Sequence, residues 1–186
     1  MERSFGASTA EVAVVGMGNP YCTDDGVGVE VVRSLPSAAG YEVCEATEAG
    51  AYLAQKLVGY SRVLLVDAAP ALPPGEIRLA PLEEWEALGG ERRGAHGMSL
   101  TRALEMLRAL TGDDHTAHKV RRHLPTSGSV GPCARRPERG EELRVPEVWA
   151  LAIGIPPDPP FGEGLSPRVA AAVPAAVEEV RGWLTR

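Results

Sequence analysis

Four short apolar runs constrain the fold of this chain more than any other feature of the sequence. They occupy residues 12–15, 41–46, 63–66 and 148–153, are rich in Val, Leu or Ile, and are bounded by Gly, Pro or charged residues. Runs of this kind are typical of strands that are buried on both faces of a parallel sheet. A weaker run at 76–79 follows a Pro-Pro-Gly turn and alternates as a half-exposed edge strand does.

Helical patterns separate these runs. Residues 26–35, 50–58 and 98–110 each carry an apolar stripe with helical spacing. A last helix is expected to begin at Ser166, with Pro167 at its first position, and Pro174 should kink or crowd it. The alternation predicts a three-layer α/β/α fold with a mostly parallel central sheet, in which active sites lie at the carboxyl ends of the strands.

The length of 186 residues suits a single domain, residues 1–186. One stretch, residues 113–146, shows neither the helical nor the strand period. We expect it to be a long inserted loop that leaves the sheet and is exposed.

Composition and charge exclude several classes of function. The net charge is −6, which opposes nucleic acid as a partner because phosphate binding needs clustered Lys and Arg. No apolar run approaches the roughly 18 residues of a membrane span, and the first ten residues show no apolar core of a signal peptide. The three cysteines are widely spaced, which favours a reduced, cytoplasmic protein.

The turn after the first apolar run limits what this chain can bind. Gly16 and Gly18 resemble the opening of a dinucleotide fingerprint, but Tyr21 stands where the third glycine is required. Asp24 and Asp25 follow at the expected start of a helix, where they would repel a pyrophosphate. The turn therefore favours a cation over a phosphate and disfavours a nucleotide-binding module.

Three residues on separate connections are candidates for one site. Asp25 follows the first strand, Asp67 follows the third strand directly, and His96 precedes the 98–110 helix, so all three are expected at one edge of the sheet. Two carboxylates and an imidazole can bind a metal ion and leave positions open for water or substrate. Simpler interpretations exist: Asp24 as a helix cap, and His96 as a solvated loop residue.

The motifs together resemble those of the hydrogenase maturation proteases. The resemblance is carried in order by Gly16, Gly18, Asn19, Asp24, Asp25, Gly26, Gly28, the Val66-Asp67-Ala68 segment, His96 and the segment from Phe161 to Ser166. It implies a phosphorylase/hydrolase-like fold. It also implies an aspartic-type endopeptidase that removes the C-terminal extension of a nickel–iron hydrogenase large-subunit precursor after nickel insertion.

The resemblance places the metal-contacting and catalytic roles on Asp25, Asp67 and His96. The expected partner is the hydrogenase large-subunit precursor, and the expected metal is nickel carried by that substrate. Another divalent ion is an alternative occupant in purified protein.

Two other functions remain open at this point. The segment from Gly16 to Pro20 is also similar to the start of peptidyl-tRNA hydrolase, but that family has an Arg-His-Asn run after the threonine, where this chain has Asp24-Asp25-Gly26, so the expected histidine is missing. A non-catalytic hydrogenase maturation chaperone would carry the same ligands. A cleavage assay separates the chaperone from the protease, and salt-dependent tRNA binding would favour the tRNA hydrolase.

Overall fold

The computed structural model describes residues 10–36, 40–47, 49–87, 98–111 and 144–186. His96 lies outside these ranges, as does the part of the expected inserted loop from 113 to 143. The single-domain expectation for residues 1–186 therefore stays a prediction.

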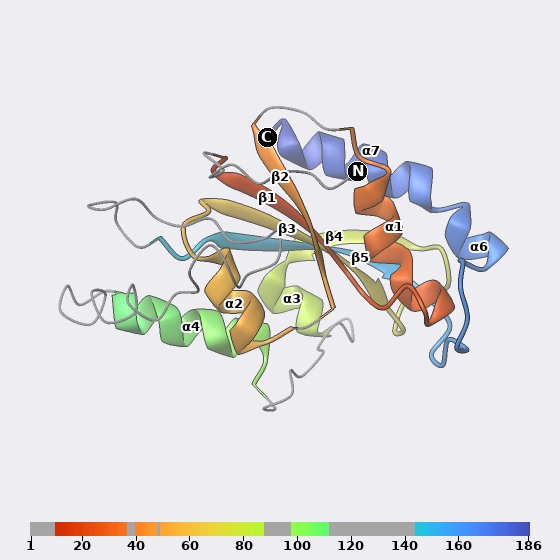
Figure 1. Cartoon of the computed structure of the whole chain (residues 1–186), viewed down its shortest axis with the longest axis horizontal. Coiled ribbons are helices and arrows are strands. Elements are labelled where there is room, and N and C mark those ends of the chain that lie inside the picture. Colours follow the sequence, from red (N-terminus) through yellow and green to blue (C-terminus); the bar gives the residue numbers. More distant parts are fainter. Residues whose placement is uncertain (1–9, 37–39, 48, 88–97, 112–143) are drawn as a thin grey trace.

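A five-stranded sheet forms the centre of the described chain, and its strands run in the order β2-β1-β3-β5-β4 (Figure 1). The strands are β1 (Val12–Met17), β2 (Tyr41–Ala46), β3 (Arg62–Ala69), β4 (Ile77–Pro81) and β5 (Glu147–Gly154). All neighbours are parallel except β4, which pairs antiparallel with β5 at the edge. The predicted strands and the edge position of the 76–79 run are confirmed.

Helices cover both faces of this sheet, so the predicted three-layer α/β/α architecture is confirmed (Figure 1). One layer consists of α2 (Ala51–Leu57), α3 (Leu82–Ala87) and α4 (Leu100–Thr111). The other consists of α1 (Val27–Arg33), α6 (Pro167–Ala170) and α7 (Val173–Leu184), and a short 3-10 turn, η1 (Thr23–Gly26), leads into α1.

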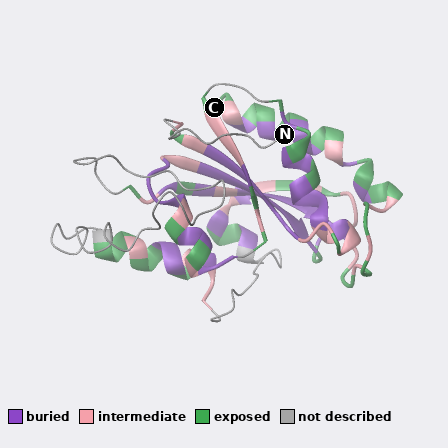
Figure 2. Cartoon of the chain, viewed as in Figure 1, coloured by how far each residue is buried: buried purple, intermediate pink, exposed green. Residues whose placement is uncertain are grey.

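Alternate side chains of the central strands enter two separate cores. Val63 and Leu65 belong to the core under α2, α3 and α4, whereas Leu64 and Val66 belong to the core under α1, α6 and α7. All four are fully buried, and Figure 2 shows the sheet as the most buried layer. Strands buried on both faces explain why the sequence shows continuous apolar runs instead of alternation.

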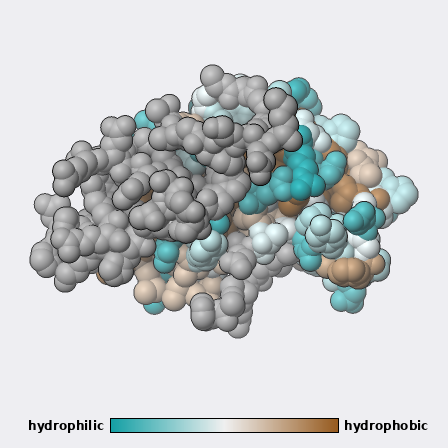
Figure 3. All heavy atoms as spheres, viewed as in Figure 1, coloured by the Kyte–Doolittle hydropathy of each residue, from teal (hydrophilic) through white to brown (hydrophobic). Residues whose placement is uncertain are grey.

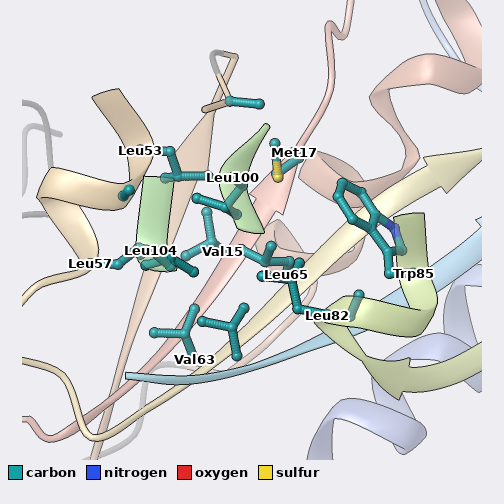
Figure 4. Close-up of a cluster of buried hydrophobic side chains, with 14 of the residues drawn as sticks. Val15, Met17, Leu53, Leu57, Val63, Leu65, Leu82, Trp85, Leu100 and Leu104 are labelled. Atoms are coloured by element: carbon teal, nitrogen blue, oxygen red, sulfur yellow. The ribbon is translucent and has the colours of Figure 1, made fainter. Parts of the chain in front are cut away.

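Two helical features differ from the expectation. The short helix α3 was not predicted, and it packs Leu82 and Trp85 into the first core (Figure 4). The last predicted helix is divided into α6 and α7, with Ala171 and Ala172 between them. The division places Pro174 in the first turn of α7, where its missing amide breaks no helical hydrogen bond.

The surface shown in Figure 3 mixes hydrophobic and hydrophilic residues at the end of the molecule where α1 and α6 lie. Tyr21 and Phe161 are exposed aromatic residues, with exposed fractions of 57% and 85%. None of the helices in the described ranges combines the length and the apolar character that a bilayer span requires.

Candidate functional site

The strands that follow β1 in the chain lie on opposite sides of it in the sheet, and this change of side defines where a site is expected. The chain leaves β1 through α1 to reach β2 on one side, and then crosses through α2 to β3 on the other side. Ligands of open α/β sheets bind outside the carboxyl ends of the strands at such a point. The carboxyl ends of β1 and β3, which carry the candidate acids, therefore border the expected site.

Asp67 is a fully buried carboxylate at this point, with an exposed fraction of 0%. The prediction that the strand ends directly before Asp67 was wrong: β3 continues to Ala69 because the pairing with β5 extends to Gly154. By alternation with Leu65, Asp67 faces the layer of α2, α3 and α4. Its Oδ1 atom accepts a hydrogen bond from the backbone amide of Ala68 at 2.8 Å.

Burial of a carboxylate in an apolar layer is costly. It is compensated by hydrogen-bond donors, by a nearby cation or by protonation. Such a group at a strand end is typical of a functional site and not of a packing position. Asp67 therefore has the properties expected of a site residue.

Asp25 lies in η1 and is partly buried. Its Oδ2 atom accepts a hydrogen bond from the backbone amide of Asn19 at 2.8 Å, which fixes the carboxylate against the loop that leaves β1. That loop approaches η1 closely, since a Cβ on Gly18 would lie 1.9 Å from the carbonyl oxygen of Asp25, and Gly18 has φ +127°. The second glycine of the motif thus allows a tight turn around Asp25.

Asp24 has a different environment from Asp25. It is 2% exposed, and its Oδ1 atom accepts a hydrogen bond from the backbone amide of Ser166 at 2.6 Å. The interpretation of Asp24 as a helix cap was wrong, because neither η1 nor α1 has a side-chain cap hydrogen bond. Ser166 is the N-cap residue of α6 as predicted, but it too makes no side-chain cap hydrogen bond.

The segments that carry Asp25 and Asp67 lie against each other. Both η1 and α1 contact β3, and a Cβ on Gly28 would lie 2.1 Å from the carbonyl oxygen of Val66. In the register of β1 and β3, Val66 pairs with Gly16, so Asp67 comes one residue beyond the last paired position. The two acids are therefore at the same edge of the sheet, as the sequence predicts.

The position of His96 is outside the described residues, but the chain that follows it is described. Helix α4 begins at Leu100, which is 2% exposed and belongs to the core on the face of Asp67. Figure 4 shows Leu100 and Leu104 of α4 within this core. The described residues alone contain no group of three or more side chains suited to a metal ion, so the triad with His96 stays a prediction.

A cleft of about 620 Å³ lies beside η1. It runs between the turn that carries Tyr21 and Thr23 and the segment that carries Glu163 and Leu165, and Pro174 of α7 also lines it. Neither Asp25 nor Asp67 lines this cleft. It is thus a neighbour of the candidate site, large enough to accept a side chain of a docked polypeptide.

An ion pair fixes α1 to the edge strand β2. Arg33 donates from Nε and Nη2 to the two carboxylate oxygens of Glu45, each at 2.8 Å. This hydrogen bonding raises the pKa of Arg33, against a smaller opposing effect of burial. Arg33 also lines the cleft, where it is a permanent positive charge beside Glu30 and Glu163.

The roles of Asn19 and Asp24 in this region were not predicted from the sequence. The backbone amide of Asn19 positions Asp25, and the side chain of Asn19 accepts from the amide of Tyr21 at 3.0 Å. Asp24 binds a residue 142 positions away. The adjacent acids were the available signal, because one cap does not need two carboxylates, but a contact over that distance has no local pattern.

Comparison with solved structures identifies proteins of the same fold. The hydrogenase maturating endopeptidase HybD from E. coli superimposes with a TM-score of 0.64 at 22% identity, covering 94% of this chain and 91% of that one. The nickel–iron hydrogenase maturation protease HybD from Thermococcus kodakarensis superimposes with a TM-score of 0.57 at 27% identity, covering 93% of this chain and 98% of that one. A hydrogenase 3 maturation protease superimposes with a TM-score of 0.55 at 19% identity, covering 94% of this chain and 92% of that one.

No protein-family model and no curated protein sequence matches the chain. The structural neighbours nevertheless confirm the resemblance drawn from the sequence at the level of the fold. The Thermococcus kodakarensis neighbour, at 27% identity, is a protease by name and supports the enzyme class of peptide-bond hydrolases for this chain.

Proposed function

We propose that this chain, which has the fold of the hydrogenase maturation proteases, is an endopeptidase that processes a nickel–iron hydrogenase large-subunit precursor. The enzyme removes the C-terminal extension of the precursor after nickel has been inserted. Asp25, Asp67 and His96 form the site that recognises the metal of the substrate. The similarity to the nickel–iron hydrogenase maturation protease of Thermococcus kodakarensis over almost the whole of both chains supports this proposal.

One observation carries the proposal: a fully buried carboxylate, Asp67, lies at the switch point of the sheet beside the turn that holds Asp25. A fold maintains a buried charge at the cost of desolvation, and stability alone does not favour such a position. The burial of Asp67 at this position supports a role in binding a ligand that carries a positive charge. A nickel ion presented by the precursor has that charge.

The chemistry of the three side chains fits a borderline metal. Carboxylate oxygens and imidazole nitrogen are both suitable nickel ligands, and three protein ligands leave positions for groups of the substrate. Each ligand binds only when it is deprotonated, so recognition requires ionised Asp25 and Asp67 and neutral His96. An empty precursor offers no such contact and is rejected.

The same residues can assist hydrolysis once the precursor is docked. Asp25 or Asp67 is a carboxylate that can accept a proton from the attacking water, while the cargo metal polarises the scissile carbonyl. Desolvation around Asp67 strengthens these electrostatic interactions.

The proposal is tested by mixing the purified protein with nickel-loaded and nickel-free precursor and measuring the precursor mass. The loaded precursor should become shorter and the empty one should not. The variants Asp25→Asn, Asp67→Asn and His96→Ala should each slow processing by about 100-fold or more. The exposed Glu179→Gln on α7 is a matched control and should process at the normal rate.

Full activity of the Asp67→Asn and His96→Ala variants would remove the basis for the metal-recognising site. A precursor that binds but keeps its mass would replace the endopeptidase with a non-catalytic chaperone.

A further inference from the structure

Asp24 holds a buried charge that the proposed reaction does not use. Among the described residues, the only charged side chains that are buried are those of Asp24 and Asp67. Asp67 borders the candidate site, whereas Asp24 accepts a hydrogen bond from the residue that precedes α6. The two adjacent acids of the turn therefore have separate tasks.

The partner of Asp24 is a backbone amide from the other end of the chain. Ser166 donates its amide to Oδ1 of Asp24 at 2.6 Å, a short, charge-assisted hydrogen bond that is partly buried. Ser166 has φ −61° and is the N-cap residue that precedes α6. The bond thus connects η1 directly to the start of the C-terminal helical unit.

Three further hydrogen bonds join the same two segments. The amide of Thr23 donates to the carbonyl of Gly162 at 2.9 Å, and the amide of Gly162 donates to the carbonyl of Tyr21 at 2.8 Å. The hydroxyl of Thr23 donates to the carbonyl of Pro160 at 3.0 Å. The two backbone bonds form a short parallel bridge at Cys22 and Gly162, and the bond between Asp24 and Ser166 joins the same two segments farther along.

The backbone of the η1 turn is strained in this arrangement. Thr23 has φ +43°, a left-handed conformation, and it is the only non-glycine residue with positive φ in the described part of the chain. A β-branched residue in this conformation is strained, and it persists only where surrounding contacts hold it. The contacts to residues 160–166 supply that restraint, one residue before Asp24 and two before Asp25.

We infer that Asp24 is a positioning residue: its bond to the Ser166 amide fixes the η1 turn and so holds the Asp25 carboxylate in place for the reaction. The inference rests on the proposed function, because it assigns Asp25 to the site. It deepens that function by linking the 160–166 segment, which also forms a wall of the cleft, to the geometry of the acid.

Four variants separate this role from general stability. Asp24→Ala removes the acceptor, and Asp24→Asn keeps an oxygen that can accept the same bond. Ser166→Pro removes the donor, and its φ of −61° already suits proline. Ser166→Ala keeps the amide and is the matched control, because the Ser166 hydroxyl makes no cap hydrogen bond.

Kinetic constants for processing of the loaded precursor are the first readout. We expect Asp24→Ala and Ser166→Pro each to lower kcat by about 100-fold, the scale expected when a reacting group is misplaced, and to raise KM as well, because Asp25 also contacts the metal of the substrate. Asp24→Asn should recover most of the lost kcat, and Ser166→Ala should retain all of it. The double variant Asp24→Ala/Ser166→Pro should be no slower than either single variant, since both remove one bond.

Amide hydrogen exchange of residues 22–26 and 162–166 is the second readout, and it does not depend on activity. Asp24→Ala should accelerate exchange in both segments together, while Ser166→Ala should leave both protected. Accelerated exchange with an unchanged kcat would overturn the positioning role and leave the proposed function intact. Absence of processing by the unaltered protein would overturn the proposed function instead, and additive effects in the double variant would overturn the shared bond.

Discussion

Gly28 and Val66 approach each other so closely that no side chain fits between them. A Cβ on Gly28 would lie 2.1 Å from the carbonyl oxygen of Val66 and 2.5 Å from that of Met17. Both oxygens belong to strands, so they cannot move away. The contact seats the first turn of α1 on the ends of β1 and β3, and Asp67 is the residue that follows Val66.

The variant Gly28→Ala should therefore be severely destabilised. Because the added methyl group meets backbone and not a flexible side chain, we expect the free energy of unfolding to fall by about 3 kcal/mol or more. Urea unfolding of the purified variant measures the change. Gly182→Ala is the control, since nothing lies within 4 Å of a Cβ at this position in α7, and alanine should stabilise that helix by about 0.5 kcal/mol. Equal stability of the two variants would contradict the close contact.

Helix α4 follows His96, and its packing on the face of Asp67 can be tested separately. Leu104 is fully buried in this core (Figure 4), so Leu104→Ala should lower the free energy of unfolding by about 2–5 kcal/mol. Leu110→Ala makes the same chemical change in the same helix, but Leu110 is 40% exposed and the loss should stay below about 1 kcal/mol. Similar losses in both variants would mean that α4 does not pack as described.

The ion pair between Arg33 and Glu45 should contribute little to the free energy of unfolding. That contribution should stay the same as the pH rises from neutral into the alkaline range. The two side chains are 52% and 43% exposed, so Glu45→Gln should cost about 0.2–1 kcal/mol, and less in high salt. The raised pKa of Arg33 means that its charge is retained below its unfolded pKa and is lost only as pH rises through a still higher value.

The difference between the wild type and Glu45→Gln should consequently stay constant from about pH 7 to about pH 10. Thermal unfolding of both proteins across this pH range measures the difference. The variant Glu178→Gln, which removes the second exposed ion pair with Arg181, is measured beside it. A difference that vanishes in this range would show that a group other than Arg33 controls the pair.

The layer arrangement was predictable from the sequence because continuous apolar runs such as 63–66 exclude a half-exposed sheet. The helical pattern of the sequence did not predict the short helix α3 or the division between α6 and α7. Six residues at 82–87 are too short to show a period, and α3 depends on the burial of Leu82 and Trp85. The division between α6 and α7 was anticipated only as a kink, since Pro174 can be accommodated by a bend or by a new helix start.

The candidate site was predictable in part for a similar reason. The position of Asp67 follows from the rule that strand ends of parallel sheets form sites, and the turn with Asp25 follows from the first strand. The separate task of Asp24 could not be predicted, because its partner is 142 residues away and is a backbone amide, which any residue except proline offers.

The central claim is that Asp25, Asp67 and His96 can bind one cation. A crystal of the protein soaked with cadmium, which stands in for the nickel of the substrate, tests it through the anomalous signal of the ion. The account predicts one cadmium ion bound by a carboxylate oxygen of Asp25, a carboxylate oxygen of Asp67 and a ring nitrogen of His96. Cadmium held by other groups, or no cadmium at these residues at a saturating concentration, would contradict it.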